Sequence, residues 1–355
     1  MYTLAYTQNF AVLKKILLIV VLFFVVISIS FVWLVYAGNT NFTEDKKTIF
    51  IATGSSFTQV QQNLLQQGCI SNTKTFNWLA AYTKYGSNIK PGKYVFDKNV
   101  SVYSILKTLK AGNQTPVKLI INKMRLPQDV AKKIAANFEC DSTAVMQIFN
   151  NADSLKAMGL VSNTAITLII PNTYELLWNS TATKIIKKLY SEQQKFWTEE
   201  RKKKATSINL TPNQVYTLAS IVEEETNMQD DKGKIASVYL NRLEIGMKLG
   251  ADPTVKFAMK DFGLKRIYQK HLSYPSPYNT YQVFGLPPGP ICTPAITTID
   301  AVLNAPNTTY LYFVAKPDFK GYSNFATTYT EHLKFAKAYQ QALNVQMAKK
   351  ATNKK

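Results

Sequence analysis

Thr211-Pro-Asn-Gln-Val-Tyr-Thr-Leu-Ala-Ser-Ile-Val-Glu-Glu-Glu-Thr226 is the stretch around which the rest of the chain can be understood. Thr211 is a typical helix N-cap, Pro212 suits the first helical position because it lacks an N–H, and Gln214 can complete a capping box. Apolar side chains then recur at helical spacing, namely Val215, Leu218, Ala219 and Val222. The stretch therefore predicts a helix with one face in a core.

Three consecutive acidic residues end this predicted helix. At about 100° per residue, Glu223 and Glu225 fall on the two shoulders of the apolar stripe, and Glu224 falls opposite it. A half-buried carboxyl group has a raised pKa and can stay protonated near neutral pH, as a general acid must. Glu223 and Glu225 are therefore candidate acids and Glu224 a surface charge, although an acidic, solvated helix end is the alternative that spacing leaves open.

The composition predicts a folded and strongly basic protein. The 355 residues include 42 Lys and Arg against 22 Asp and Glu, which gives a formal net charge of +20, and 46% of the residues are hydrophobic. This length is enough for a membrane anchor and two or more globular parts. The charge suits an anionic partner, such as nucleic acid, phospholipid or a cell-wall polymer, and does not choose among them.

Cysteine and histidine are both scarce. Cys69, Cys140 and Cys292 are odd in number and far apart, so neither a zinc motif nor a complete disulfide framework is predicted, although one bridge stays open. His271 and His332 are the only histidines, which argues against a His-rich metal site and a hydrolase triad. We expect neither a metal nor a cofactor.

Residues 16–36 carry no charge and are long enough to cross a hydrocarbon core of about 30 Å. Lys14 and Lys15 precede them, whereas residues 39–45 lack Lys and Arg, so the positive-inside rule leaves residues 1–15 in the cytoplasm. We expect a single-pass anchor in the cytoplasmic membrane, with a cleaved signal peptide as the alternative. The rest of the chain would then meet the cell wall, which makes nucleic acid the weaker partner.

Two folded parts are predicted beyond the anchor, which makes the fold class α+β. Short strands and helices in residues 48–121 predict a small module for adhesion or positioning. Residues 122–345 predict a mixed α/β catalytic domain, with a long helix over 181–201 and buried strands at 166–170 and 311–315. Residues 346–355 predict a disordered basic tail.

Two further stretches carry side chains suited to binding. Arg242 falls within the apolar stripe of a helix predicted over 231–249, so it either reaches water or pairs with a carboxylate or an anionic substrate group. Asp252 is either a helix cap or that partner. The stretch 274–294 combines Pro and Gly with aromatic and amide side chains, which suits sugar binding, or else a loop that covers a core.

These stretches occur in the order and spacing of a known family. The motifs of the YceG-like (MltG) endolytic murein transglycosylases resemble Leu218-Ala-Ser-Ile-Val-Glu-Glu-Glu-Thr226, Ala236-Ser-Val-Tyr-Leu-Asn-Arg-Leu243, Asp252-Pro-Thr-Val255, Tyr278-Asn-Thr-Tyr281 and Gly285-Leu-Pro-Pro-Gly-Pro-Ile291. The resemblance covers nearly the whole chain, and Ile89-Lys-Pro-Gly-Lys-Tyr94 resembles part of the family's LysM-like subdomain. It implies an enzyme that cleaves the MurNAc-β-1,4-GlcNAc bond within nascent glycan strands, leaves 1,6-anhydroMurNAc ends and terminates strand elongation.

The resemblance also implies roles for individual residues. By position in the motif, Glu223 corresponds to the catalytic glutamate, with Glu225 as the secondary candidate. Because the sugar's own C6 hydroxyl attacks, one carboxyl group suffices where an ordinary glycosidase needs two. The implied substrate-binding residues are Arg242, Asp252, Tyr278, Asn279, Thr280 and Tyr281. The implied partners are peptidoglycan glycan strands and the membrane, with peptidoglycan synthases as candidates and no nucleic acid.

Several positions depart from the family pattern. Gly250-Ala251 stands where a Gln-Ser or Gln-Thr pair is usual, Thr293-Pro294-Ala295 replaces Asn-Pro-Gly, and Ser323 stands where a histidine is frequent. These differences concern the substrate cleft and leave Glu223 unchanged. Two other functions stay open from the sequence: a wall-binding scaffold without catalysis, and an anchored hydrolase that produces reducing ends.

Overall fold

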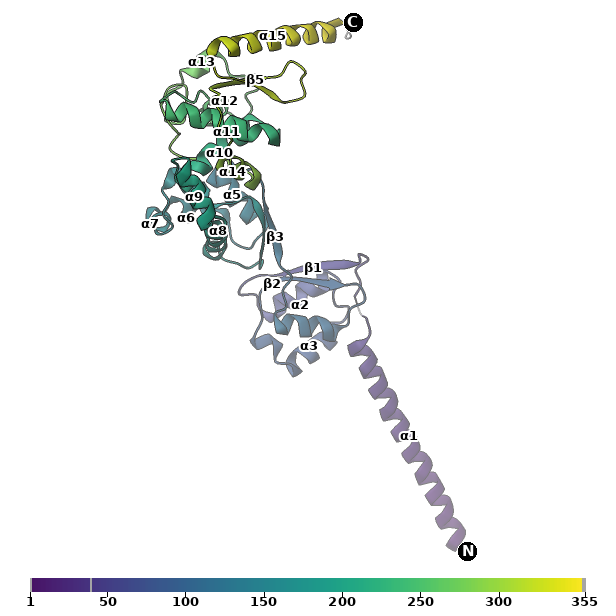
Figure 1. The fold of residues 1–355 in the computed structure, drawn as a ribbon. Helices are drawn as coiled ribbons and strands as arrows, with labels where there is room; N and C mark the ends of the chain where they lie inside the picture. The colour runs from purple at the N-terminus through teal and green to yellow at the C-terminus, as the bar shows by residue number, and fades with distance from the viewer. Residues whose placement is uncertain (1, 39, 353–355) are drawn as a thin grey trace. The chain divides into compact units, whose positions relative to one another are not determined.

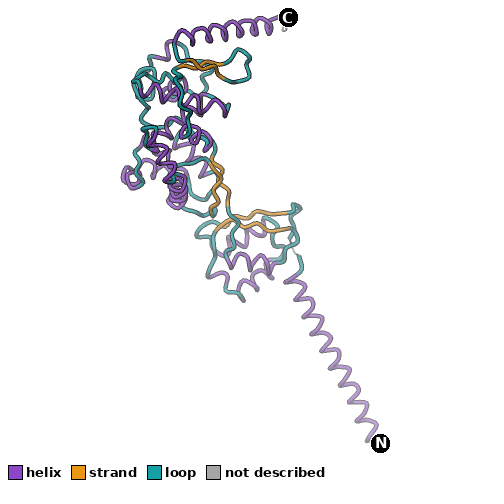
Figure 2. Tube along the Cα trace, in the orientation of Figure 1, coloured by secondary structure: helices purple, strands orange, loops and turns teal. Residues whose placement is uncertain are grey.

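The computed structural model describes residues 2–38 and 40–352, and it divides into two compact units (Figure 1). The first unit comprises Met1–Val117 with Glu175–Ser180, and the second comprises Lys118–Tyr174 with Thr181–Lys355. Helices and loops make up most of both units, and the strands form small two-stranded sheets (Figure 2). The predicted mixture of helices and strands is thus confirmed.

The N-terminal helix α1 (Tyr2–Tyr36) contains the predicted membrane-spanning segment. Within it, the 21 residues Leu13–Trp33 are apolar enough to cross a bilayer, and they are not buried by the protein. A helix of this length and composition near the N-terminus is compatible with a membrane anchor and also with a signal sequence.

The first unit has the order strand, two helices, strand, helix. Strands β1 (Lys46–Ile51) and β2 (Gly92–Asp97) pair antiparallel, with Lys46 opposite Asp97. Ser56 begins the first helix through a capping box with Gln59. The helices are α2 (Phe57–Gln66), α3 (Thr73–Tyr82), η1 (Tyr85–Ser87) and α4 (Val102–Ala111). Of these, α3 was not predicted from the sequence.

The second unit is mainly helical. Strands β3 (Val117–Ile121) and β4 (Asn172–Leu176) form a two-stranded sheet. The helices between them are α5 (Pro127–Ala135), α6 (Ser142–Asn150), α7 (Ala152–Ala157) and η2 (Ser162–Leu168). The later elements are α8 (Ala182–Phe196), α9 (Glu199–Ser207), α10 (Pro212–Glu225), α11 (Gln229–Glu244), α12 (Asp252–Met259), α13 (Gln269–Leu272), α14 (Ile296–Leu303), β5 (Tyr312–Ala315), β6 (Ser323–Ala326) and α15 (Tyr329–Thr352).

Helix α10 lies at the centre of this unit. The capping box between Thr211 and Gln214 is present, Pro212 is the first helical residue, and the four residues of the predicted stripe are fully buried. Burial extends around the whole helix, because every residue from Val215 to Val222 is buried. Helices α11, α12 and α14 pack against it, so α10 has no solvent-facing side in its central turns.

Two predictions for the second unit were wrong in detail. Residues 166–170 do not form a strand. The buried segment Ser162–Leu168 is the 3₁₀ helix η2, and the strand β4 begins later, at Asn172. A short buried apolar run has no periodicity that separates strand from helix, which explains this error. The long helix expected over 181–201 is interrupted at Trp197, where Thr198 caps the new helix α9.

The C-terminal part closes one end of the second unit. Strands β5 and β6 pair antiparallel, and α15 packs beside them (Figure 1). The strand expected at 311–315 is half-buried rather than buried. The predicted disordered tail begins at residue 346, whereas α15 continues to Thr352, and residues 353–355 lie outside the described residues.

Candidate active site

The three acidic residues at the end of α10 have three different environments. Because α10 is surrounded by other elements, each carboxylate meets the side chains of a different neighbour. The chemical role of each carboxylate therefore depends on these neighbours.

Glu223 belongs to an ion pair in the protein interior. Lys232 Nζ of α11 lies 2.9 Å from Glu223 Oε2, and the two side chains are 7% and 15% exposed. Thr298 of α14 donates a hydrogen bond to the same carboxylate oxygen and accepts one of 2.6 Å from Lys232 Nζ. The carboxylate of Glu223 thus joins three helices.

Glu224 is not the surface charge that helical geometry predicted. Its side chain is 17% exposed, and Arg125 Nη2 lies 3.0 Å from both of its carboxylate oxygens. Lys123 Nζ lies 3.2 Å from Glu224 Oε1. Burial raises the pKa of Glu224, but these two cations outweigh burial and hold the pKa below its ordinary value. Glu224 therefore stays ionised and ties α10 to the segment between β3 and α5.

Glu225 lies in the wall of a cleft of about 500 Å³, called the acid cleft below. Tyr239 of α11 donates a hydrogen bond of 2.7 Å to Glu225 Oε1. Burial raises the pKa of Glu225 to about 7, and the hydrogen bond from Tyr239 opposes that shift only in part. No Lys or Arg forms an ion pair with Glu225 in the described part of the chain. This carboxyl group can therefore carry a proton near neutral pH.

Three of the predicted substrate-binding residues line the acid cleft together with Glu225. They are Arg242, Asp252 and Tyr281. Arg242 makes no ion pair in the described part of the chain, and its Nε donates to the backbone oxygen of Leu311 at 2.7 Å. Asp252 is the first residue of α12 rather than its cap, and it accepts a 2.7 Å hydrogen bond from Tyr281 Oη. The pairing of Arg242 with Asp252 that the sequence left open is therefore absent.

Gly250, where the motif resemblance leads us to expect glutamine, forms part of the same wall. A Cβ atom at this position would lie 3.6 Å from Arg242 Nη1 and 3.6 Å from the ring of Tyr281. The glycine has φ +57°, a conformation that a glutamine would adopt only with strain. The substitution therefore leaves space between Arg242 and Tyr281.

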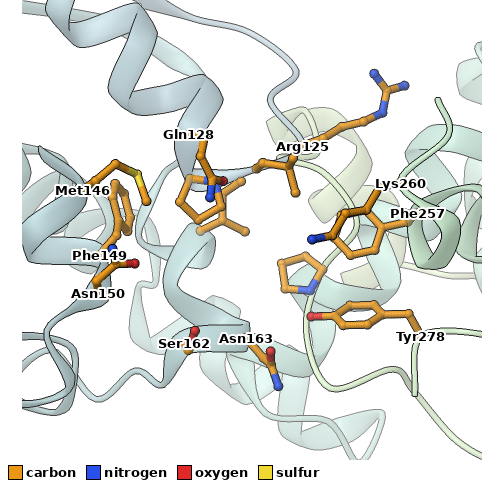
Figure 3. A pocket seen from close by; sticks show the side chains of 14 residues that line it. Arg125, Gln128, Met146, Phe149, Asn150, Ser162, Asn163, Phe257, Lys260 and Tyr278 are labelled. Carbon is orange, nitrogen blue, oxygen red and sulfur yellow. The ribbon is translucent and has the colours of Figure 1, made fainter. Parts of the chain in front are cut away.

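The other three predicted substrate-binding residues lie elsewhere. Asn279 is fully buried and donates from Nδ2 to the backbone oxygens of Leu272 and Tyr274. Thr280 is also fully buried, and its hydroxyl bonds with the backbone N–H of Ala251 and the hydroxyl of Thr254. These two side chains shape the loop from inside. Tyr278 lines a different cavity, shown in Figure 3.

Tyr239 and Lys248 are among the residues of the acid cleft that sequence reasoning missed, as is His332 of α15. Its ring stacks on Tyr312 at 5.3 Å between centroids, and its Nδ1 is buried without a hydrogen-bond partner among the described residues. Burial and the charge of Arg242 lower the pKa of His332, so the ring is neutral at pH 7. Because His332 follows Glu225 by more than 100 residues, no local sequence pattern indicated that the two side chains would line one cleft.

The thiols and the acidic groups give no metal centre. Cys69, Cys140 and Cys292 are free thiols, which settles the disulfide that the sequence left open. Within residues 2–38 and 40–352, no three His, Cys, Asp or Glu side chains gather in a way that could hold a metal ion.

Fold and cleft together define a class: an α+β protein with an apolar N-terminal helix and a mainly helical unit whose cleft contains one carboxyl group with a raised pKa. Comparison with known proteins identifies that class. The model of the YceG-like family matches residues 49–338, so the chain belongs to the YceG-like family.

Named relatives and a solved structure agree with this assignment. The endolytic murein transglycosylase of Bacillus subtilis is 29% identical over 85% of this chain and 88% of its own length. That of Streptococcus pneumoniae is 25% identical over 76% of this chain, and the match spans 54% of that longer protein. The crystal structure of a YceG-like protein from Listeria monocytogenes matches with a TM-score of 0.56 and 27% identity, covering 82% of this chain and 99% of that one.

Proposed function

We propose that this protein is an endolytic lytic transglycosylase of peptidoglycan, held at the cytoplasmic membrane by α1 with both units outside. The supporting observations are family membership, the names of the relatives and the protonatable carboxyl group in the acid cleft. The bond cleaved would be the MurNAc-β-1,4-GlcNAc bond within nascent strands, which ends strand elongation. The strand–helix–helix–strand order of the first unit suits a LysM-like wall-binding module, and peptidoglycan synthases would be its neighbours.

Glu225, in place of Glu223, is the residue we propose as the general acid. With a pKa of about 7, half of its molecules carry the proton near neutral pH, which suits an acid that later acts as a base. Glu225 would protonate the glycosidic oxygen as the bond to the MurNAc C1 breaks, and its carboxylate would then accept the proton of the attacking C6 hydroxyl. Glu223 is instead paired with Lys232 and Thr298 through Oε2 and does not line the acid cleft.

The cleft walls support this assignment through charge and hydrogen bonding. Arg242 and Lys248 are cations in the wall of the acid cleft, and Arg242 can bind an anionic or carbonyl group of the substrate. His332 lines the same cleft with a ring that is neutral at pH 7. Tyr281 and Asp252 form a hydrogen-bonded pair in the cleft wall, where they can position a second sugar.

One observation favours a second function, hydrolysis to a reducing end. Asp252 is exposed, lines the acid cleft, and its charge contributes to the raised pKa of Glu225. A second carboxylate near the acid is what an inverting glycosidase uses to activate water. The two functions differ in their product and share Glu225 as the acid.

Analysis of the products tests the proposed function. Purified full-length protein is incubated with sacculi, and the released muropeptides are analysed by mass spectrometry before and after borohydride reduction. We expect 1,6-anhydroMurNAc ends, which borohydride does not reduce, and we expect Glu225→Gln to lower their release by about 100-fold or more because no proton donor remains.

A matched control is Glu244→Gln, because Glu244 is an exposed carboxylate near the end of α11; its activity should equal that of the wild type. New reducible MurNAc ends would instead establish the hydrolase, and binding to sacculi without new ends would establish the scaffold. Undiminished activity of Glu225→Gln would contradict the assignment of the acid.

A further inference from the structure

The second unit contains another cavity, of about 280 Å³, called the α12 pocket below (Figure 3). Met146 and Phe149 of α6 form one apolar wall, and Phe257 and Tyr278, whose ring centroids are 4.7 Å apart, form the other. Its rim carries amide and hydroxyl side chains, among them Asn163. An apolar interior with a few convergent polar groups is typical of a ligand-binding pocket.

The polar groups of the α12 pocket suit a carboxylate. Figure 3 shows the ammonium group of Lys260 and the hydroxyl of Tyr278 directed into the pocket from the same wall, while the guanidinium group of Arg125 is turned away. Arg125 is already paired with Glu224, whereas Lys260 forms no ion pair with any described residue. Tyr278 Oη likewise makes no hydrogen bond within the described chain. A cation and a hydroxyl donor are thus available to one anionic group.

The pocket is held open by a close backbone contact. A Cβ atom on Gly289 would lie 1.8 Å from the backbone oxygen of Asn163, so only glycine lets the loop lie this close to η2. The same hypothetical atom would lie 3.2 Å from Tyr278 Oη. The contact brings the loop that carries Pro290 against η2, and Pro290 and Asn163 both line the pocket, while the ring of Tyr278 packs on Phe257.

Helix α12 leads from the acid cleft to this pocket. Asp252 lines the acid cleft, Lys256 lines a smaller hollow of about 110 Å³, and Lys260, just after α12, lines the α12 pocket. The spacing of four residues places Asp252 and Lys256 on one side of the helix, and Lys260 is its C-cap. The smaller hollow and the α12 pocket share Arg125 and Phe257 in their walls, so these two hollows adjoin, and α12 links them to the acid cleft through Asp252 and its neighbour Pro253.

The distance along α12 matches a short peptide. Eight residues separate Asp252 from Lys260, which is about 12 Å along a helix axis. An extended peptide covers about 3.3–3.6 Å per residue, so three or four residues bridge that distance. Peptidoglycan carries a peptide of this length on the lactyl group of MurNAc, and that peptide ends in a carboxylate.

We propose, on the basis of the function proposed above, that the α12 pocket binds the carboxyl-terminal end of this stem peptide while its sugar occupies the acid cleft. Lys260 and Tyr278 bind the terminal carboxylate, and the apolar walls contact the last side chains. The protein then distinguishes peptide-bearing strands from bare glycan.

Binding of free peptide tests the pocket without any need for catalysis. A synthetic stem tetrapeptide with a free C-terminal carboxylate, and the same peptide as its C-terminal amide, are titrated into full-length protein in detergent. Line broadening of the peptide signals in nuclear magnetic resonance reports weak binding. We expect the acid to bind about ten-fold more tightly than the amide, because only the acid has a charge for Lys260.

The variants Lys260→Gln and Lys265→Gln complete that experiment. Lys265 is an exposed lysine in the loop after α12 and lines no described hollow, so its replacement should leave the ten-fold preference unchanged. Lys260→Gln should abolish it. Equal binding of acid and amide by the wild type, or a preference that survives Lys260→Gln, would overturn the proposal.

Cleavage kinetics separate this inference from the proposed function. Glycan strands with intact stems are compared with strands from which an amidase has removed the peptides. We expect kcat/KM of the wild type to be about ten-fold higher on intact strands, and Lys260→Gln to lower it on those strands alone. Equal cleavage of both substrates would contradict stem-peptide binding by the α12 pocket and leave the proposed transglycosylase function intact. Cleavage of neither substrate would contradict both proposals.

Discussion

Glu223 and Glu225 are two residues apart in the sequence, and their surroundings differ. The side chain of Glu223 is paired with a cation, and that of Glu225 has no such partner among the described residues. Glu223 forms a buried ion pair with Lys232. Glu225 has its pKa raised to about 7 by burial, so at higher pH the fold holds a carboxylate in a place that disfavours it. Removing one partner of a buried ion pair destabilises the fold, because the other charge stays buried without a partner. Removing an unpaired buried charge stabilises the fold.

Replacement of each residue by glutamine should therefore shift stability in opposite directions at pH 8.5. Glu223→Gln leaves Lys232 buried without its carboxylate and should lower the free energy of unfolding by about 3 kcal/mol. Glu225→Gln removes a charge that costs about 2 to 3 kcal/mol above pH 7, and should raise the thermal unfolding midpoint by several degrees. Circular dichroism of both variants in detergent measures the midpoints.

The pH dependence gives the control for this pair. A raised pKa in the folded protein means that wild-type stability falls as pH rises from about 4.5 to about 7, and the gain from Glu225→Gln should disappear near pH 4.5. The stability lost in Glu223→Gln should be partly recovered by a second substitution, Lys232→Met, which removes the unpaired cation. A destabilised Glu225→Gln at pH 8.5 would argue against a buried, protonatable Glu225.

Among the elements, the end of the proline- and glycine-rich loop is held between α10 and the segment after β3. The hydroxyl of Ser220, fully buried in α10, accepts a 2.9 Å hydrogen bond from the backbone N–H of Ile291. Two residues later, the backbone N–H of Thr293 donates to the oxygen of Met124 at 2.8 Å. The walls of the α12 pocket and of the smaller hollow depend on this arrangement, because Pro290 lines the α12 pocket and Ile291 lines the smaller hollow.

Ser220→Ala should destabilise the second unit by about 1 to 3 kcal/mol, because it leaves the N–H of Ile291 buried without an acceptor. Hydrogen exchange measures this directly: protection of the Ile291 amide should fall more than that of amides in α8. Ser207→Ala is the matched control, since Ser207 lies at the exposed end of α9 and its loss should change stability by less than about 0.5 kcal/mol. Unchanged protection at Ile291 would exclude this role for Ser220.

For the molecule as a whole, the arrangement of anchor and charge suits work at the membrane surface. The apolar stretch of α1 precedes two folded units in a chain with a formal net charge of +20. Positive charge attracts an anionic wall polymer at long range, and an anchor confines the encounter to newly made strands next to the membrane. Under the proposed function, both features would direct cleavage to nascent rather than mature peptidoglycan.

Fractionation of cells tests the anchor. We expect the full-length chain to stay with the membrane through carbonate extraction and to keep its N-terminal residues when its mass is measured, because residues 16–36 are long and apolar enough to span the bilayer. Deletion of residues 1–36 should release the protein from the membrane. Loss of about 37 residues from the mature protein, with recovery in the soluble fraction, would instead identify a signal peptide.

How much of this follows from the sequence is clearest at α10. Thr211, Pro212 and Gln214 specified the start of the helix, and the apolar spacing specified its buried stripe, because capping and periodicity depend on neighbours within a few residues. The order of the motifs led to the family, which the comparison confirmed. Local rules failed at residues 166–170, where burial leaves no periodic pattern to read.

The identity of the candidate acid needed the tertiary structure. Helical geometry narrowed it to Glu223 and Glu225, and the partners that separate them come from elsewhere: Lys232 and Thr298 for one, Tyr239 for the other. His332 joined the acid cleft in the same way. A sequence fixes where a side chain points around its own helix axis, whereas its pKa and its access to substrate depend on which distant elements pack against it.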